Sequence, residues 1–237
     1  MRLQLASTLI PILAIVLCQA GFAAAISTKE NDRLVRSAQV LQEMIEAPDK
    51  NIPKGMLDHA RCVAIVPSLK KAGLGWGGRY GNGFVTCRRG DSGSWGPVSS
   101  FKIVGGSVGF QIGGAAVDVI LLFVNQKGVE KLLKDQFTLG GDASVAAGPV
   151  GRQGTAETDI LLASEIYSYS RARGLYAGIS LNGARMYRDA DVNRDLYGRD
   201  VPAEDILVTP KVGIPGAAQP LIGVLNRYSP RAPYVKK

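Results

Sequence analysis

The stretch from Ala72 to Gly114 constrains the fold more than any other part of the sequence. It holds about half of the chain's 29 glycines, and they interrupt otherwise β-like segments, AGLGWGGRYGNGFVTC and GGSVGFQIGG. Glycine in a strand interior gives up side-chain packing and loses more backbone entropy on folding than other residues. A strand that keeps so many glycines is typical of tight bends, bulges, or another surface brought close to the backbone.

The N-terminus has the pattern of a secretory signal at residues 1–25. Arg2 gives a positive start, residues 9–17 form a short apolar run, and 23–25 offer an A-x-A cleavage site. A retained membrane anchor is the alternative, but the apolar run is short for a bilayer span. Lipid attachment at Cys18 is disfavoured because a bulky leucine precedes it. We therefore expect export, to the periplasm or the surface of an envelope membrane.

No linker divides the rest of the chain, so we expect a single domain over residues 26–228, followed by a flexible basic tail at 229–237. The formal net charge is +8, of which Arg2 leaves with the signal. Such a charge suits an anionic partner, either a phospholipid surface or nucleic acid, although solubility alone is a simpler explanation. Export makes nucleic acid a poor candidate and favours a membrane surface.

Two cysteines remain after signal cleavage, Cys62 and Cys87. An even pair in an exported chain is typical of a disulfide, and both residues lie in strand-like runs that neighbouring strands can place side by side. The chain-entropy model gives such a loop about 3.5 kcal/mol of stabilisation. Two buried free thiols are the alternative.

The apolar spacing predicts an α+β fold with a strongly bent, mainly antiparallel sheet or partial barrel. Helices are expected at both ends of the chain and once in the middle. The helical segments begin at a capping box at 27–30 and include 52–60, 125–135 and 217–228, with shorter helical or irregular pieces at 188–197 and 203–207. Strand-like runs lie at 61–66, 74–80, 83–88, 98–104, 107–113, 117–124, 165–171 and 175–187.

The first helix is amphipathic, with Leu34, Ala38, Leu41 and Ile45 on one face. Such a helix can lie on a membrane or pack on its own domain. Its polar face mixes both signs of charge and its apolar face lacks Trp and Phe, which favours packing on the domain.

Sequence motifs give little support for catalysis. Gly73, Gly75 and Gly78 match G-x-G-x-x-G, but strand-like sequence follows where a dinucleotide site needs a helix. His59 is the only histidine, which excludes sites that need two and leaves no metal or cofactor to predict. We expect no enzyme, with a hydrolase built on a Ser–Lys pair as a minor alternative.

Several blocks between Val63 and Gly183 carry a family resemblance. They are AIVPSLKKAGLGWGGRYGNGFV (64–85), SWGP (94–97), GGSVGFQIGGAAVDVILLFVN (105–125), ASVAAGPVG (143–151) and YSYSRARGLYAGISLNGA (167–184). Together they resemble the SYLF domain, a lipid-binding family also called the Ysc-type actin-binding domain. The flanking helices and the placement of the two cysteines resemble exported bacterial members.

The resemblance implies a non-enzymatic protein that binds anionic phospholipid headgroups. Actin binding is not expected of an exported bacterial member, and a structural or protein-interaction role in the envelope is the alternative. The candidate lipid-binding residues are Lys70, Lys71, Arg79, Arg88, Arg89 and Trp76, with Arg152, Arg171 and Arg173 in the second matching part. Tyr80 and Trp95 are further aromatic candidates for the headgroup level, although tryptophans such as Trp76 and Trp95 are more often packed in the core or at its rim.

Overall fold

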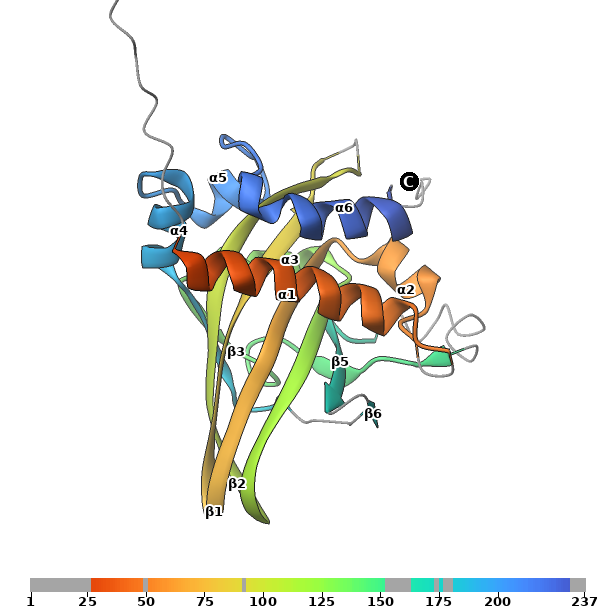
Figure 1. Cartoon of the computed structure of the whole chain (residues 1–237), viewed down its shortest axis with the longest axis vertical. Helices are drawn as coiled ribbons and strands as arrows, with labels where there is room; N and C mark the ends of the chain where they lie inside the picture. Colours follow the sequence, from red (N-terminus) through yellow and green to blue (C-terminus); the bar gives the residue numbers. More distant parts are fainter. Residues whose placement is uncertain are drawn as a thin grey trace, which may run out of the picture.

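The computed structural model describes residues 27–48, 51–90, 93–151, 163–172, 175–176 and 181–230, with only the backbone for 73–76, 107–113 and 175–176. Two long antiparallel strands dominate it, β1 (Cys62–Arg88) and β2 (Trp95–Phe123). They stay paired from Cys62 opposite Phe123 to Arg88 opposite Trp95. The pair bends back on itself at its midpoint, far from the helices (Figure 1).

The bend brings the two ends of β1 together. A disulfide joins Cys62 to Cys87, whose Cα atoms lie 4.0 Å apart, so the predicted disulfide is present. Beside it, the Arg88 amide donates to the Arg61 carbonyl at 2.8 Å. The two halves approach so closely that a Cβ on Gly83 would lie 2.1 Å from the Ile65 carbonyl oxygen. Only glycine allows this close approach between the two halves of one strand.

Shorter strands extend the folded pair into a seven-stranded sheet. β5 (Ile166–Ala172) pairs with the last part of β2, and β4 (Val145–Ala147) and β6 (Leu175–Tyr176) pair with β5. β7 (Arg185–Arg188) pairs with the first part of β2, and β3 (Gln136–Thr138) pairs with β7. All of these pairings are antiparallel except β4 with β5.

Side-chain alternation along the two long strands builds two apolar clusters. Cys62, Ala64 and Val66 point into one cluster together with Val85 and Cys87 from the other half of β1. Intervening residues such as Val63, Ile65 and Phe84 pack into the second cluster, which the helices complete. Burying both faces of one curled sheet in this way makes the hairpin the core of the domain.

Helices cover one face of the sheet at the disulfide end (Figure 1). They are α1 (Thr28–Ile45), α2 (Lys54–His59) and α6 (Gln219–Tyr228), with the short η3 (Gly216–Ala218) leading into α6. The Ser27 hydroxyl caps α1 by accepting from the Glu30 amide, as predicted. Leu34, Ala38 and Leu41 of α1 are buried, so this helix packs on its own domain.

The remaining helices are α3 (Gln126–Leu132), α4 (Ala190–Tyr197) and α5 (Ala203–Leu207). All three lie where the sequence pattern placed helical segments. The α+β class, the bent antiparallel sheet and the helices at both ends and in the middle are therefore confirmed. Within the described residues, no helix combines the length and apolar character needed to cross a bilayer.

The expected division into many short strands is wrong. The runs at 61–66, 74–80 and 83–88 are one strand, and those at 98–104, 107–113 and 117–124 are another. Glycines did not end the strands because glycine stands opposite glycine in the register, as Gly73 opposite Gly113, Gly75 opposite Gly109 and Gly78 opposite Gly106. Both strands can bend at the same level without losing their pairing.

The predicted strand at 175–187 is also divided. Its described parts are β6 and β7, and a turn with Gly183 at φ +77° precedes β7. The predicted signal at 1–25, with Cys18, lies outside the described residues, as do Arg152, Arg173 and residues 231–237 of the predicted tail.

Candidate functional site

The bend brings three of the predicted cations to one end of the molecule. Lys70 and Lys71 lie in β1 before the bend, opposite Ala116 and Ala115 of β2. Arg79 lies in β1 after the bend, opposite Gly105. Lys70 is exposed, Lys71 is half-buried and Arg79 is 8% exposed. Burial lowers the pKa of Lys71, and the positive charge of Arg79 lowers it further, so the two cations lie within electrostatic reach of each other.

The position of Arg79 is fixed by contacts within the part of the hairpin after the bend. Its Nη2 donates to the Gly106 carbonyl at 3.1 Å, and burial lowers its pKa. A Cβ on Gly105 would lie 2.8 Å from the Ala184 Cα, so the turn before β7 packs directly on this strand. The guanidinium is thus held against the first half of β2.

Arg88 lies at the opposite, disulfide end and stabilises the fold there. Its guanidinium donates to the carbonyls of Ala60 at 3.0 Å and Gly93 at 2.7 Å, and to the Ser229 hydroxyl. It also stacks over the Trp95 ring, 4.1 Å from the centroid. Burial lowers the pKa of Arg88 to about 10, which leaves the group charged at neutral pH. These contacts give Arg88 a structural role that the sequence did not predict.

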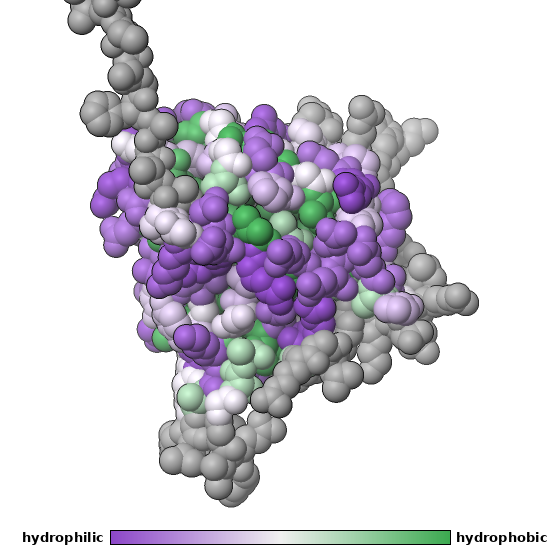
Figure 2. Space-filling view, in the orientation of Figure 1, coloured by the Kyte–Doolittle hydropathy of each residue, from purple (hydrophilic) through white to green (hydrophobic). Residues whose placement is uncertain are grey.

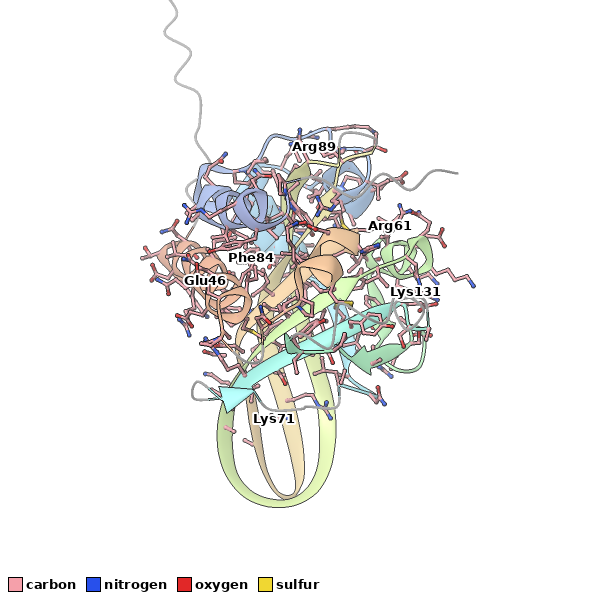
Figure 3. All side chains as sticks on the ribbon, turned by 90° about the vertical axis from the view of Figure 1, so that its right-hand side faces the viewer. Glu46, Arg61, Lys71, Phe84, Arg89 and Lys131 are labelled. Atoms are coloured by element: carbon pink, nitrogen blue, oxygen red, sulfur yellow. A yellow bond between two sulfur atoms is a disulfide. The ribbon has the colours of Figure 1, made fainter. Side chains whose placement is uncertain are left out.

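The six predicted lipid-binding residues therefore do not form one group. Arg89 is half-buried beside Arg88 at the upper end in Figure 3, whereas Lys71 lies near the bend. Nine residues of extended strand separate Lys71 from Cys62 at the disulfide, roughly 30 Å along β1. Trp76 stands opposite Val108 at the bent end, and its side chain lies outside the described part.

Arg171 lies in an ion-pair network that joins α1 to the sheet. It contacts Glu43 of α1 and lies 3.3 Å from Asp118 Oδ2 of β2, which Arg36 of α1 also reaches at 3.3 Å. Asp118 Oδ1 accepts from the Ser68 amide at 3.0 Å, where β1 bulges and Ser68 has φ +58°. The hydrogen bond from Arg171 lowers the pKa of Glu43.

This ion-pair network was not predicted from the sequence. Its members come from three separate elements, and no local spacing links them. Only the pairing of Asp118 with Arg171 in the register of β2 and β5 brings their side chains together.

The aromatic candidates separate into buried and exposed residues. Trp95 is 2% exposed, and its Nε1 donates to the Ser229 carbonyl at 2.8 Å, so its assignment to a headgroup level is wrong. Tyr80 is 47% exposed and stands opposite Val104, which is 42% exposed. Together they place an exposed apolar pair beside Arg79 at the bent end.

The described residues offer little for metal or nucleophilic chemistry. They contain no group of three His, Cys, Asp or Glu side chains arranged to hold a metal ion. His59 Nδ1 lies 2.7 Å from the Gly55 carbonyl oxygen at the end of α2. This histidine therefore has a local helical contact, as its sequence position indicates.

Comparisons with known proteins place this architecture in a family. A family described as "Las17-binding protein actin regulator", Ysc84, matches residues 104–228. The human SH3 domain-containing YSC84-like protein 1 is 34% identical over 202 residues, which cover 82% of this chain and 58% of the relative. Protein YSC84 of Saccharomyces cerevisiae is 32% identical over 202 residues, covering 84% and 42%.

An SH3 domain-containing protein of Schizosaccharomyces pombe is 36% identical over 178 residues, covering 74% of this chain and 41% of the relative. The chain thus spans about half the length of the curated relatives it matches. The names of two of these relatives describe SH3 domain-containing proteins, the family description names an actin regulator, and none of these descriptions names an enzyme. On the family match and on these relatives, the chain belongs to the Ysc84, or SYLF, family.

Proposed function

We propose that this chain is a non-enzymatic binding protein that holds anionic phospholipid headgroups at a membrane surface. The contact residues are Lys70, Lys71 and Arg79 at the bent end of the hairpin. Arg88 and Arg89 do not take part, because they lie at the other end of the hairpin, beside the disulfide.

The single observation behind the proposal is that the bend gathers Lys70, Lys71 and Arg79 at one end of the hairpin, where Lys71 is half-buried and Arg79 is 8% exposed. Two like charges that are partly removed from water repel each other and lose hydration, and the lowered pKa of Lys71 reflects both effects. A phosphate placed between them offsets both costs through charge-assisted hydrogen bonds. Exposed Lys70, on the opposite face of the strand from Lys71, adds a third cation at this end of the hairpin.

An exported protein of a bacterial envelope is the proposed setting. The signal-like pattern at residues 1–25 supports export, and the Cys62–Cys87 disulfide is of the kind that persists in oxidising compartments. In that setting, phosphatidylglycerol and cardiolipin are the anionic phospholipids to test.

The experiment is vesicle co-sedimentation of residues 26–237. We expect binding to rise with the phosphatidylglycerol fraction of phosphatidylcholine vesicles and to fall with added salt. The double variant K70E/K71E removes two cations worth about 1 kcal/mol each at an anionic surface, so its affinity should fall at least about thirtyfold.

The matched control is K127E/K134E, which makes the same charge change at two exposed lysines around α3. We expect it to bind nearly as well as the unmodified protein. Equal sedimentation with neutral vesicles, or equal losses for the two double variants, would contradict a headgroup site at the bend.

A protein-binding role in actin regulation is the second candidate. The description of the matching family supports it, and our expectation that actin binding should not be carried over finds no support in the comparisons. Co-sedimentation with actin filaments tests this candidate. Pelleting with filaments, together with no response to anionic vesicles, would favour it over lipid binding.

A further inference from the structure

The bent end of the hairpin carries few charges, and all of them are positive. In β2, the sequence from Ile103 to Val117 contains no Asp, Glu, Lys or Arg, and in β1 the facing stretch from Leu69 to Gly81 contains only Lys70, Lys71 and Arg79. The surfaces of the helices at the other end are rich in charged side chains, and Figure 2 shows a paler, greener area below that polar band. The end that projects away from the helices is thus chemically distinct.

We call the exposed residues described near the bend, apart from Lys70, the bent-end surface; alternation along β2 places Ala115 on the other face of the strand from Gly114 and Ala116. All of its members are uncharged, and they are small or apolar apart from the tyrosine hydroxyl. They are Ala72, Gly78, Tyr80, Val104, Gly106, Gly114, Ala115 and Ala116. An exposed apolar area with a charged border is typical of a site that meets a protein or a membrane.

Packing explains only some of the glycines in this region. Gly83 and Gly105 are required, because a Cβ at either position would collide with backbone atoms of Ile65 or Ala184. A Cβ on Gly106 would meet nothing within 4 Å, and on Gly78 or Gly114 only a carbonyl oxygen at 3.9 or 3.8 Å. None of the latter three has a positive φ. The packing of the fold would therefore allow side chains at these three positions of the bent-end surface, where the sequence has glycine.

The charge at its border selects a lipid surface as the occupant. Lys70, Lys71 and Arg79 lie beside the uncharged surface, and Tyr80 belongs to it, the arrangement expected where cations meet phosphates and an amphipathic ring lies at the interface. About four residues of strand lead from Lys71 to the midpoint of β1, a reach of roughly 13 Å. That reach exceeds the roughly 7 Å thickness of one headgroup layer.

The backbone limits how deep the bend can go. Within the described sheet, residues 70–78 of β1 pair only with β2, so their other edge needs hydrogen bonds from water. Hydrocarbon cannot supply those bonds, whereas the hydrated interface can. The structure therefore favours shallow insertion over a membrane-spanning position.

We propose that the bent end of the β1–β2 hairpin inserts into the interfacial layer of an anionic bilayer while Lys70, Lys71 and Arg79 contact the phosphates. This inference rests on the proposed lipid-binding function and adds penetration to it. The helix-covered end then faces away from the membrane.

The chain's two tryptophans allow a direct test, because Trp76 lies at the bent end and Trp95 lies at the disulfide end. We expect vesicles of phosphatidylglycerol with brominated acyl chains to quench the fluorescence of the protein and to shift its emission to the blue. The variant W76F, which retains only Trp95, should bind the same vesicles with almost no quenching.

A second pair of variants makes the test independent of Trp76. V104W in the W76F background places a probe on the bent-end surface, and K127W in the same background places one on α3 as the matched control. We expect quenching of the first probe and not of the second. Sedimentation measured on the same samples separates the two proposals: binding without quenching at 76 or 104 overturns insertion alone, and absence of binding overturns lipid binding as well.

Discussion

The two ends of the folded hairpin differ in what holds them. The disulfide end has Cys62–Cys87, the Arg88 contacts and the cover of α1, α2 and α6. The bent end has glycine opposite glycine, an exposed Tyr80–Val104 pair and two cations close together. The disulfide and the helix cover lie at one end, and exposed uncharged residues beside a few cations lie at the other. One strand pair therefore has a structural end and an end that is available for binding.

The largest expected effect in this comparison is loss of the disulfide. Replacing both cysteines by serine frees the loop that joins the two ends of β1, which lie 25 residues apart in sequence. We expect the free energy of unfolding to fall by about 3.5 kcal/mol in urea titrations. A loss of less than about 1 kcal/mol would mean that the helices alone hold this end together.

Replacing one glycine with alanine in each region compares the stability cost of adding a single methyl group. In G83A, the new Cβ would lie 2.1 Å from the Ile65 carbonyl oxygen, and backbone cannot move aside as a side chain can. We expect a loss of about 1–3 kcal/mol in the same titrations. G106A should change stability by less than about 0.5 kcal/mol, because its Cβ would meet open space. Equal effects of the two substitutions would remove the distinction between packed and unpacked glycines.

The smallest expected effect concerns the ion-pair network that ties α1 to the sheet. The hydrogen bond from Arg171 holds the pKa of Glu43 below its usual 4.5, so the folded state favours the carboxylate. The resulting stabilisation is present above pH 4.5 and is lost as the pH falls through the lowered pKa of the folded state. Because the Glu43 side chain is itself exposed, E43Q should cost less than about 1 kcal/mol at pH 7.

The pH dependence is what identifies this effect. The stability difference between E43Q and the unmodified protein should shrink as the pH falls from 5 to 3, as measured by urea midpoints, whereas E130Q on α3 serves as an exposed control. A difference that is unchanged at pH 3 would show that Glu43 acts through packing and not through its charge.

The sequence predicted the helices, the bent antiparallel sheet and the cysteine pair, because each has a local signal in spacing, capping or residue type. It did not predict that β1 and β2 run through their glycines, since the pairing of Gly75 with Gly109 joins residues far apart in the chain. Lys70, Lys71 and Arg79 were predicted as candidates from their charge. Their separation from Arg88 was not predicted, because it depends on the same long-range pairing. The bend in the strand pair determines which of these side chains lie close together, and hydrophobic periodicity does not predict the position of that bend.

Amide hydrogen exchange with and without phosphatidylglycerol vesicles tests the central claim most directly, because it reports on both ends in one sample. The account predicts slower exchange in peptides covering residues 70–81 and 102–116, with little change in α1, α6 or the strand segments beside the disulfide. Slowing confined to the helices, with no change at the bend, would contradict it.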